Sequence, residues 1–296
     1  MYLVTGATGQ LGRRIVRKLR EQNLPVRAFV RLTSRYAELE DRGAEIFIGD
    51  LRQDQDIQKA CQGVISIISA HGTNEASENS NAQAIDYRAN VQLIDQAKAV
   101  GVQHFTFISV LGADRGYQDS PVFKAKWEIE KYLQASGLNY TILRPSGFSS
   151  NLLPAAERFR RTGVYLLIGD PENRTSIVST DDLARIAAEA SQNQQSHRQV
   201  LAVGGPEILQ RQDIPKIFGS IFNREPTILN LPLLAVDGLR NVLGIFNPQA
   251  KEALGTLRVL LANEFFCTAL ETEQLESIFA LKLETLESFL RRYLSV

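Results

Sequence analysis

Three glycines near the amino terminus have a spacing that suits phosphate binding. Gly6, Gly9 and Gly12 stand in the segment VTGATGQLG, between an apolar run and a helical pattern. Glycine in such a turn tolerates unusual backbone angles, and a missing side chain lets the backbone approach a pyrophosphate. The free N–H groups at the start of the helix would face the phosphates. The segment therefore predicts a dinucleotide-binding loop, with a ligand-free tight turn as the alternative.

The end of the second apolar run indicates which dinucleotide binds. A site for NAD usually carries Asp or Glu there, to hold the ribose hydroxyls. This chain has Arg31, with Arg35 close behind, and a guanidinium suits a 2′-phosphate. We therefore expect NADP(H), with a solvated surface arginine as the alternative. Asp50, after the third apolar run, is placed either to meet the adenine or to cap the next helix.

These residues need a fold that brings strand ends together. Apolar runs of strand length alternate with amphipathic helical patterns through the first half of the chain, a rhythm typical of parallel sheets with right-handed crossovers. The expected strands are 2–5, 26–30, 45–48, 64–69, 105–109 and 140–143. The expected helices are 11–22, 34–42, 54–61, 84–100 and 123–136, the last ended by Gly137. The predicted fold class is α/β, a doubly wound parallel sheet of the Rossmann type.

The alternation of strands and helices becomes less regular after Pro145. We expect irregular chain with a short helix over 149–170, strands at 176–178 and 200–203, helices from 181 and over 211–222, and a last helix over 275–293. This organisation predicts a dinucleotide-binding core at 1–148 and a smaller, mainly helical substrate or partner lobe at 149–296, with returns to the core near 176–190 and 200–204. The polar stretch 73–82 is the expected mobile loop.

Composition narrows the class of protein. Lys plus Arg and Asp plus Glu number 33 each, so no nucleic-acid partner is expected. No Cys or His spacing suggests a metal site, and two isolated cysteines fit reduced core thiols of a cytoplasmic protein. We expect no signal peptide, because the first strand begins at Tyr2. No apolar stretch reaches the roughly 20 residues of a membrane span.

The segment 226–246 is unusually apolar. We interpret it as a strand and a helix that pack into the core. The alternatives are a wall of a substrate pocket, or a surface for a protein partner or for peripheral membrane contact.

Several longer segments resemble the atypical short-chain dehydrogenase/reductases, in particular the NmrA-like and isoflavone-reductase-like group. They are VTGATGQLGRRIV, VRAFVR, GAEIFIGDL, IDYRANVQLIDQAKAVGVQHFTFISV and FKAKWEIEKYLQASGLNYTILRPSGF. The similarity covers about half the chain, through Phe148, and a weaker similarity continues beyond it.

The resemblance implies a role for each matching position. The pyrophosphate loop would consist of Gly6, Thr8, Gly9, Gln10, Leu11 and Gly12. Arg31 would meet the 2′-phosphate of NADP(H), and Asp50 and Leu51 would flank the adenine. The other positions implied to line the cofactor are Ser69, Ala70, Ser109, Lys126, Pro145 and Phe148.

The tyrosine–lysine pair usual in this superfamily is incomplete. Lys126 matches the lysine, but Val122 stands four positions earlier, where the tyrosine is expected. Lys126 would hold the ribose hydroxyls and polarise a proton donor, with a solvated helix lysine, like Lys131, as the alternative. Without the tyrosine, carbonyl chemistry lacks its proton donor. The candidates to replace it are His71, Tyr117 and Ser109.

Two functions follow from the resemblance, and whether the chain is an enzyme stays open between them. The first is an NADPH-dependent reductase of an apolar, conjugated or quinone-like small molecule, as in the quinone reductases and divinyl chlorophyllide reductases of the group. The second is a non-catalytic NADP(H)-binding regulator or photosystem II assembly factor. The missing tyrosine favours the second function, whereas the retained Lys126 favours the first. The sequence leaves the oligomeric state open.

Overall fold

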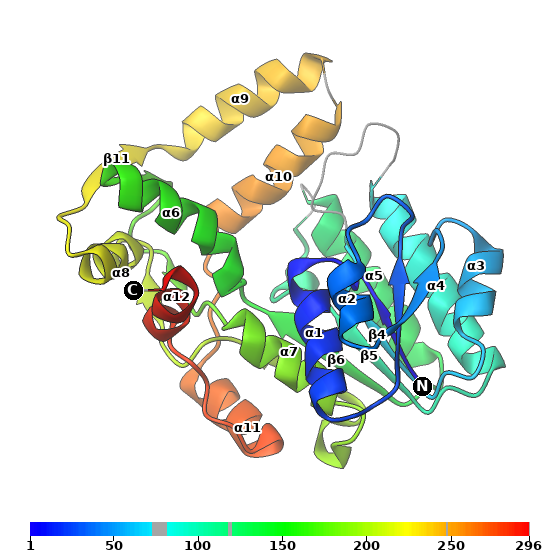
Figure 1. The fold of residues 1–296 in the computed structure, drawn as a ribbon. Coiled ribbons are helices and arrows are strands. Elements are labelled where there is room, and N and C mark those ends of the chain that lie inside the picture. The colour runs from blue at the N-terminus through cyan, green and yellow to red at the C-terminus, as the bar shows by residue number, and fades with distance from the viewer. Residues whose placement is uncertain (73–81, 118–119, 247, 296) are drawn as a thin grey trace. The chain divides into compact units, whose positions relative to one another are not determined.

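The computed structural model describes residues 1–72, 82–117, 120–246 and 248–295 (Figure 1). It comprises two compact units. The first unit holds Met1–Asp114, Val122–Arg144 and Thr180–Leu201, and the second holds Arg115–Pro121, Pro145–Ser179 and Ala202–Val296. The loop expected at 73–82 lies outside the described residues, except for Ala82.

A seven-stranded sheet has the order β3-β2-β1-β4-β5-β6-β9. Its strands are β1 (Tyr2–Thr5), β2 (Val26–Val30), β3 (Glu45–Ile48), β4 (Ser66–Ser69), β5 (His104–Ile108), β6 (Tyr140–Pro145) and β9 (Gln199–Val203). The pairs β3–β2, β2–β1, β1–β4, β4–β5 and β5–β6 are parallel. From β1, the chain adds β2 and β3 on one side and then β4, β5 and β6 on the other. This order confirms the doubly wound Rossmann-type sheet.

Helices cover the sheet of the first unit on both faces. They are α1 (Gln10–Glu21), α2 (Ala37–Asp41), α3 (Asp54–Ala60), α4 (Ala82–Ala99), α5 (Pro121–Ala135) and α7 (Thr180–Glu189), with short 3₁₀ turns at Ala113–Arg115 and Gln194–Ser196. Helices α1 and α7 pack together, and Arg17 of α1 pairs with Asp181 of α7 at 2.7 Å. On the other face, α3, α4 and α5 bury side chains such as Ile57, Leu93 and Ile129 against the strands.

The strand register fixes which residues meet at the carboxyl edge of the sheet. Thr5 of β1 lies beside Ser69 of β4, and Ser69 lies beside Phe107 of β5. All these strands run in one direction, so the loops that follow them emerge at the same edge, where ligands bind in folds of this class.

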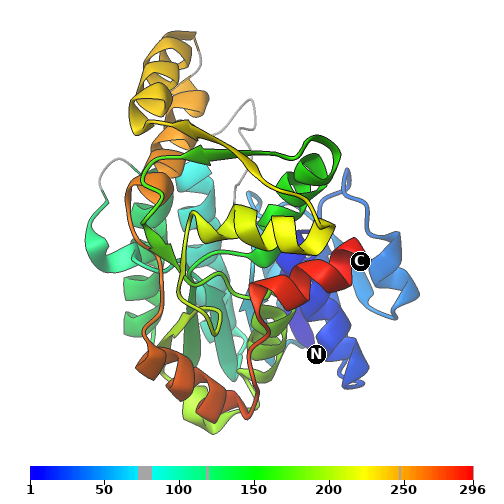
Figure 2. The same cartoon turned by 90° about the vertical axis from the view of Figure 1, so that its left-hand side faces the viewer.

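The second unit contains two small sheets and a helical core (Figure 2). Its strands are β7 (Val164–Ile168), β8 (Arg174–Thr175), β10 (Leu209–Gln210) and β11 (Thr227–Leu231), and its helices are α6 (Leu153–Thr162), α8 (Asp213–Phe222), α9 (Leu233–Phe246), α10 (Pro248–Ala262), α11 (Ala269–Phe279) and α12 (Leu286–Leu294), with a 3₁₀ turn at Ser149–Leu152. Strands β7 and β11 pair in parallel, and β8 and β10 in antiparallel fashion. Phe159, Phe218 and Phe289 bring α6, α8 and α12 together in one apolar core.

Three expectations for this half of the chain are wrong. The stretch 149–170, expected as irregular chain with a short helix, contains that helix as α6 but also the strand β7. The strand expected at 176–178 is β8 at Arg174–Thr175, and Val178 makes only an isolated bridge to Phe148. The helix expected over 275–293 is broken into α11 and α12, because Ala280 turns left-handed and Thr285 caps a new helix.

The apolar segment 226–246 has the expected strand and helix, β11 and α9, but its packing into the core is contradicted. Leu229 is 52% exposed, Leu234 77% and Leu239 50%. The only charged residue in 226–239 is Asp237, and it pairs with Arg258 of α10 at 2.5 Å. Helices α9 and α10 run side by side as a hairpin (Figure 1). This part of the chain therefore presents leucines to solvent.

Cys61 and Cys267 are both unpaired and buried, as expected of core thiols, and burial raises the pKa of each to about 12. In the part of the chain that the structure describes, every helix is too short or too polar to cross a membrane.

The buried His104 makes the stability of the first unit sensitive to acid. Burial and the neighbouring His197, whose ring centroid lies 4.7 Å away, lower the pKa of His104 to about 3. The unfolded chain binds a proton near pH 6.5 and the folded chain does not, so unfolding becomes easier as the pH falls from about 6.5 to 3. We expect His104→Phe to weaken this dependence by at most about 1.4 kcal/mol per pH unit.

The measurement is urea unfolding at a series of pH values. His104→Phe loses the hydrogen bond to Thr141 and should be somewhat less stable at pH 7, by about 1 kcal/mol. Some pH dependence will remain, because His71 also has a lowered pKa. An unchanged slope between pH 6.5 and 4 would contradict the assignment.

Candidate functional site

Two of the three loop glycines lie where no side chain fits. Gly6 has φ +69°, and a Cβ there would lie 2.6 Å from the carbonyl oxygen of Ala70, directly after β4. A Cβ on Gly12 would lie 2.1 Å from the carbonyl oxygen of Gly6, and the N–H of Gly9 donates to that same oxygen at 3.0 Å. The loop is thus packed against the end of β4 on one side and against α1 on the other.

The start of α1 offers backbone donors to an anion. Gly9 is its N-cap residue and provides no side-chain cap, and the first turn carries no acidic residue. Thr8 is half-buried, and Gln10 is exposed and accepts from Arg14. Leu11 is buried and holds the turn against the core. Such uncapped N–H groups can donate to an anion, and their assignment to a pyrophosphate stays a prediction.

Arginines gather beside this loop. Arg31 follows β2 directly, is exposed, and makes no side-chain hydrogen bond or ion pair within the described residues. Arg13 donates to the carbonyls of Thr8, at 2.8 Å, and of Arg35, at 3.0 Å, and pairs with Glu38. Arg13 therefore ties the glycine loop to the segment after β2. Sequence reasoning missed it, although its place directly after the third glycine was a usable signal.

Asp50 does not cap the helix that follows it. The N-cap residue of α3 is Gln53, whereas the Asp50 carboxylate accepts from the backbone N–H and the guanidinium of Arg52 at 2.9 Å each. The Arg52 hydrogen bonds hold the pKa of Asp50 below its usual value, and Arg31 adds to this effect. Leu51 is half-buried and packs on the apolar core. The alternative role of Asp50 as a helix cap is therefore excluded, and the adenine role stays a prediction.

His71 is held on both ring nitrogens at the end of β4. Its Nδ1 lies 2.8 Å from the hydroxyl of Thr5, and its Nε2 lies 3.0 Å from Nδ2 of Asn90. Asn90 Nδ2 also donates to the carbonyl of Asp86 at 2.7 Å, and Asn90 Oδ1 accepts from the buried Ser69 hydroxyl at 2.6 Å. These contacts join β1, β4 and α4 at the carboxyl edge of the sheet.

This network keeps the imidazole of His71 neutral. Since Nδ2 of Asn90 donates, Nε2 of His71 must accept, and the ring proton resides on Nδ1, where it is donated to Thr5. Burial lowers the pKa of His71 to about 4, and Lys126 contributes, against the opposing effect of Asp86. A proton donor at neutral pH needs an N–H that faces its acceptor. The geometry therefore supports a positioning role for His71 more than an acidic one.

Lys126 is buried, so the alternative interpretation of Lys126 as a solvated helix lysine is wrong. Its Nζ donates to the carbonyl of Ile108 at 2.8 Å and lies 4.7 Å from the ring centroid of Phe107. Burial lowers the pKa of Lys126, while Asp86 and Glu130 oppose this. Lys131 on the same helix is exposed and pairs with Glu128 at 2.8 Å.

Asp86 and Lys126 both lie close to Gly72. A Cβ on Gly72 would lie 3.9 Å both from Asp86 Oδ2 and from Lys126 Nζ. The ammonium group and a buried carboxylate therefore flank the chain two residues beyond Ala70. The glycine loop, the His71 network and Lys126 thus lie near the same end of β4.

A buried carboxylate fixes the helix that carries Lys126. Glu130, one turn further along α5, is fully buried, accepts from the Ser109 hydroxyl, and pairs with Arg144 at 2.6 Å. Arg144 also pairs with Asp114 at 2.7 Å. Because Ser109 donates to Glu130, its hydroxyl ties β5 to α5. Glu130 and Arg144 were missed from the sequence, because nothing in their spacing distinguishes them from ordinary surface charges.

The remaining predicted residues belong to the second unit. Tyr117 packs its ring on Phe265, with centroids 5.9 Å apart. Pro145 ends β6, and Phe148 follows three residues later and forms a bridge to Val178. Their assignment to the cofactor or to catalysis stays a prediction.

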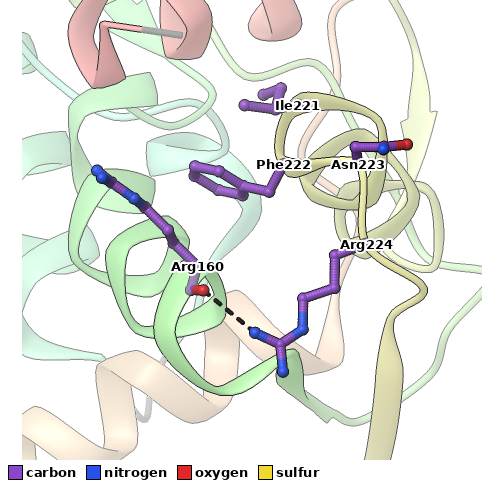
Figure 3. A pocket seen from close by; sticks show the side chains of 5 residues that line it. All are labelled: Arg160, Ile221, Phe222, Asn223 and Arg224. Carbon is purple, nitrogen blue, oxygen red and sulfur yellow. Dashed lines mark hydrogen bonds between the residues drawn. The ribbon is translucent and has the colours of Figure 1, made fainter.

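At least two hollows lie in the described part of the second unit. One is a cavity of about 280 Å³ between the segment after β6, strand β7 and the helices α8 and α10, with Phe148, Tyr165 and Arg211 among its lining residues. The other, shown in Figure 3, lies against the carboxyl end of α8. There Arg224 donates to the carbonyls of Arg160 and Thr162 and so caps α6. The second hollow is therefore lined by residues whose contacts have a structural role.

Comparison with known proteins agrees with this geometry. The family described as NAD(P)H-binding matches residues 6–194. The photosystem II assembly factor Ycf39 of Cyanophora paradoxa is 28% identical over 99% of this chain and 92% of its own. The NAD(P)H azoreductase of Xenophilus azovorans is 29% identical over 92% of this chain and 91% of its own. The crystal structure of the quinone oxidoreductase QOR2 of Escherichia coli with NADPH is similar with a TM-score of 0.78, at 22% identity over 99% of this chain and 100% of that one.

The fold and the glycine loop define a dinucleotide-binding protein of the Rossmann class. The chain belongs to the NAD(P)H-binding family, whose model matches residues 6–194. This agrees with the resemblance and confirms a nicotinamide dinucleotide as the cofactor, whereas the preference for NADP(H) that Arg31 predicts stays a prediction.

Arg31, which makes no side-chain hydrogen bond or ion pair within the described residues, provides a test of the preference for the 2′-phosphate. We expect Arg31→Asp to weaken NADPH binding by roughly tenfold to hundredfold, the loss of one charge-assisted contact, and to leave NADH binding nearly unchanged. The measurement is isothermal titration of both dinucleotides into wild type and variant. Arg42→Asp, which removes an exposed arginine paired with Glu38, is the control. Equal losses for NADPH and NADH would contradict the assignment.

Proposed function

We propose that this protein is an NADPH-dependent reductase of an apolar, conjugated or quinone-like small molecule. The observation that carries the proposal is the buried ammonium group of Lys126, oriented by Ile108 and flanked by Asp86, at the end of the sheet where the glycine loop lies. Burying a lysine costs free energy, and buried groups with shifted pKa values cluster at functional sites. NADPH, when bound, supplies the hydride.

Residues of the first unit bind the cofactor, supply the proton and position the chain. The loop from Gly6 to Gly12 binds the pyrophosphate, and Arg31 binds the 2′-phosphate. Lys126 holds the ribose hydroxyls and keeps a proton available at Nζ while the acceptor gains negative charge. Neutral His71, fixed between Thr5 and Asn90, keeps the chain after β4 in place. The hydrogen-bond geometry around His71 leaves Lys126 as the favoured source of the proton.

The relatives support this chemistry. The azoreductase and the quinone oxidoreductase are named for reductions of conjugated acceptors by nicotinamide cofactors. Such acceptors take up a hydride without the alcohol–ketone chemistry for which the superfamily uses its tyrosine. The absence of a tyrosine at Val122 is therefore compatible with a reductase of this kind.

A second function is favoured by the exposed leucines of β11 and α9. Leu229, Leu234 and Leu239 are each at least half exposed in the stretch 226–239, whose charged residue Asp237 pairs with Arg258. A patch of this kind suits a protein partner or a membrane surface, and the likeness to Ycf39 proteins points to a role in assembly. In this proposal NADP(H) is a structural or regulatory ligand. The two buried, unpaired thiols fit a reducing compartment such as the cytoplasm.

Replacement of Lys126 tests the reductase directly. We expect Lys126→Met, which keeps the length of the buried stem, to lower kcat for NADPH oxidation with 1,4-naphthoquinone about 100-fold or more. Lys131→Met on the same helix should retain the wild-type rate. Absorbance at the nicotinamide band gives the rates, and circular dichroism checks the fold. A Lys126→Met variant as active as Lys131→Met would overturn the role of Lys126.

Replacement of exposed leucines tests the second function. We expect the double variant Leu234→Glu and Leu239→Glu to lose any partner retained by the wild-type protein in pull-downs, while its NADPH affinity stays the same. Leu270→Glu, an equally exposed leucine at the start of α11, is the control. Loss of the partner from both variants, or from neither, would rule out this surface.

A further inference from the structure

The cavity of about 280 Å³ in the second unit has the character of a binding site for a flat molecule. Its walls include the aromatic rings of Phe148, Tyr165 and Phe265 and the aliphatic side chains of Ile177 and Ile214. Its size lies near the lower end for ligand pockets, enough for one or two fused rings. Flat apolar walls bind conjugated rings through burial and ring stacking.

One guanidinium group in this cavity lacks a carboxylate partner. Arg211 donates to the carbonyls of Leu261, at 2.7 Å, Ile168, at 3.2 Å, and Leu260. No ion pair joins it to a carboxylate in the described ranges of the chain. Arg174, which lines the same cavity, differs because Glu264 pairs with it at 2.7 Å. Arg211 thus brings to the cavity a positive charge that forms no ion pair within the described residues.

The three carbonyl contacts also fix the position of Arg211. They come from the ends of β7 and α10, two elements that form the cavity wall. Burial lowers the pKa of Arg211, and Tyr165 and Asp170 oppose this. A guanidinium group held by neutral carbonyls is still a full positive charge in a half-buried place, and it gains most from an anion that accepts two hydrogen bonds.

Tyr165 offers a second polar group. Its ring packs edge-on against Phe218, with centroids 5.6 Å apart, and its hydroxyl has no hydrogen-bond partner in the part of the chain that the structure describes. Burial raises the pKa of Tyr165, while Arg211 opposes this. The phenol is therefore protonated at neutral pH and can donate to an oxygen atom of a ligand.

We propose that this cavity binds a planar conjugated ring that carries an anionic substituent, a carboxylate or a sulfonate. Arg211 pairs with the anion, Tyr165 donates a hydrogen bond to the ligand, and the aromatic walls cover the ring. The further step, that this ligand is the electron acceptor, rests on the proposed reductase function. Arg211 is then the residue that determines the charge preference of the enzyme.

Equilibrium binding tests the site without requiring turnover. The probes are 2-naphthoate and 2-naphthamide, which have the same ring system and differ in charge, titrated calorimetrically into the protein with NADPH present. We expect wild type to bind naphthoate about tenfold more tightly. Arg211→Gln should abolish this preference, Arg211→Lys should retain part of it, and Tyr165→Phe should weaken both probes. Arg160→Gln, the same charge change elsewhere in the second unit, should keep the preference.

Two outcomes would overturn the proposal. One is equal affinity of the wild-type protein for both probes, which needs no variant to fold. The other is a preference that survives in Arg211→Gln. Steady-state oxidation of NADPH with 1,4-naphthoquinone and its 2-sulfonate separates this inference from the reductase function. Turnover of both acceptors with no effect of Arg211→Gln would refute the charge preference alone, whereas selective naphthoate binding without any turnover would refute the reductase alone.

Discussion

The close approach of Gly6 to the chain after β4 is the constraint on which the site depends. Parallel pairing places Thr5 beside Ser69, so the loops after β1 and β4 leave the sheet together. Only a residue without a side chain can lie there, because a Cβ on Gly6 would meet the Ala70 carbonyl at 2.6 Å. That contact leaves the start of α1 open to a phosphate and places His71 between Thr5 and Asn90.

Charge balance at the same strand ends supports a buried lysine. Lys126 is buried, and Val122 stands where the resemblance implies a tyrosine. Asp86 and Glu130 favour the charged form of Lys126 against the effect of burial. Glu130 also holds Arg144, which keeps α5 against the sheet. The lysine is thus supported by a network that does not need the tyrosine, as expected if its role is to hold ribose and proton.

The sequence predicted local features well and long-range contacts poorly. The strands of the sheet and the glycine loop depend on apolar runs and on glycine spacing, which are visible in the sequence. The Glu130–Arg144 pair joins residues of two elements whose packing decides the contact, so no local pattern reveals it. The exposure of Leu234 was misjudged for the same reason: an apolar helix predicts burial, and only the tertiary structure shows that nothing in the described chain covers this leucine.

The central claim is that hydride passes from bound NADPH to a conjugated acceptor in this protein. The most direct test is anaerobic rapid mixing of the protein and 1,4-naphthoquinone with NADPH deuterated at C4, in separate experiments for each face of the nicotinamide. The account predicts acceptor-dependent loss of the nicotinamide absorbance, with a primary isotope effect for one face only. Tight NADPH binding without acceptor-dependent oxidation would contradict it and leave a binding protein that performs no reduction.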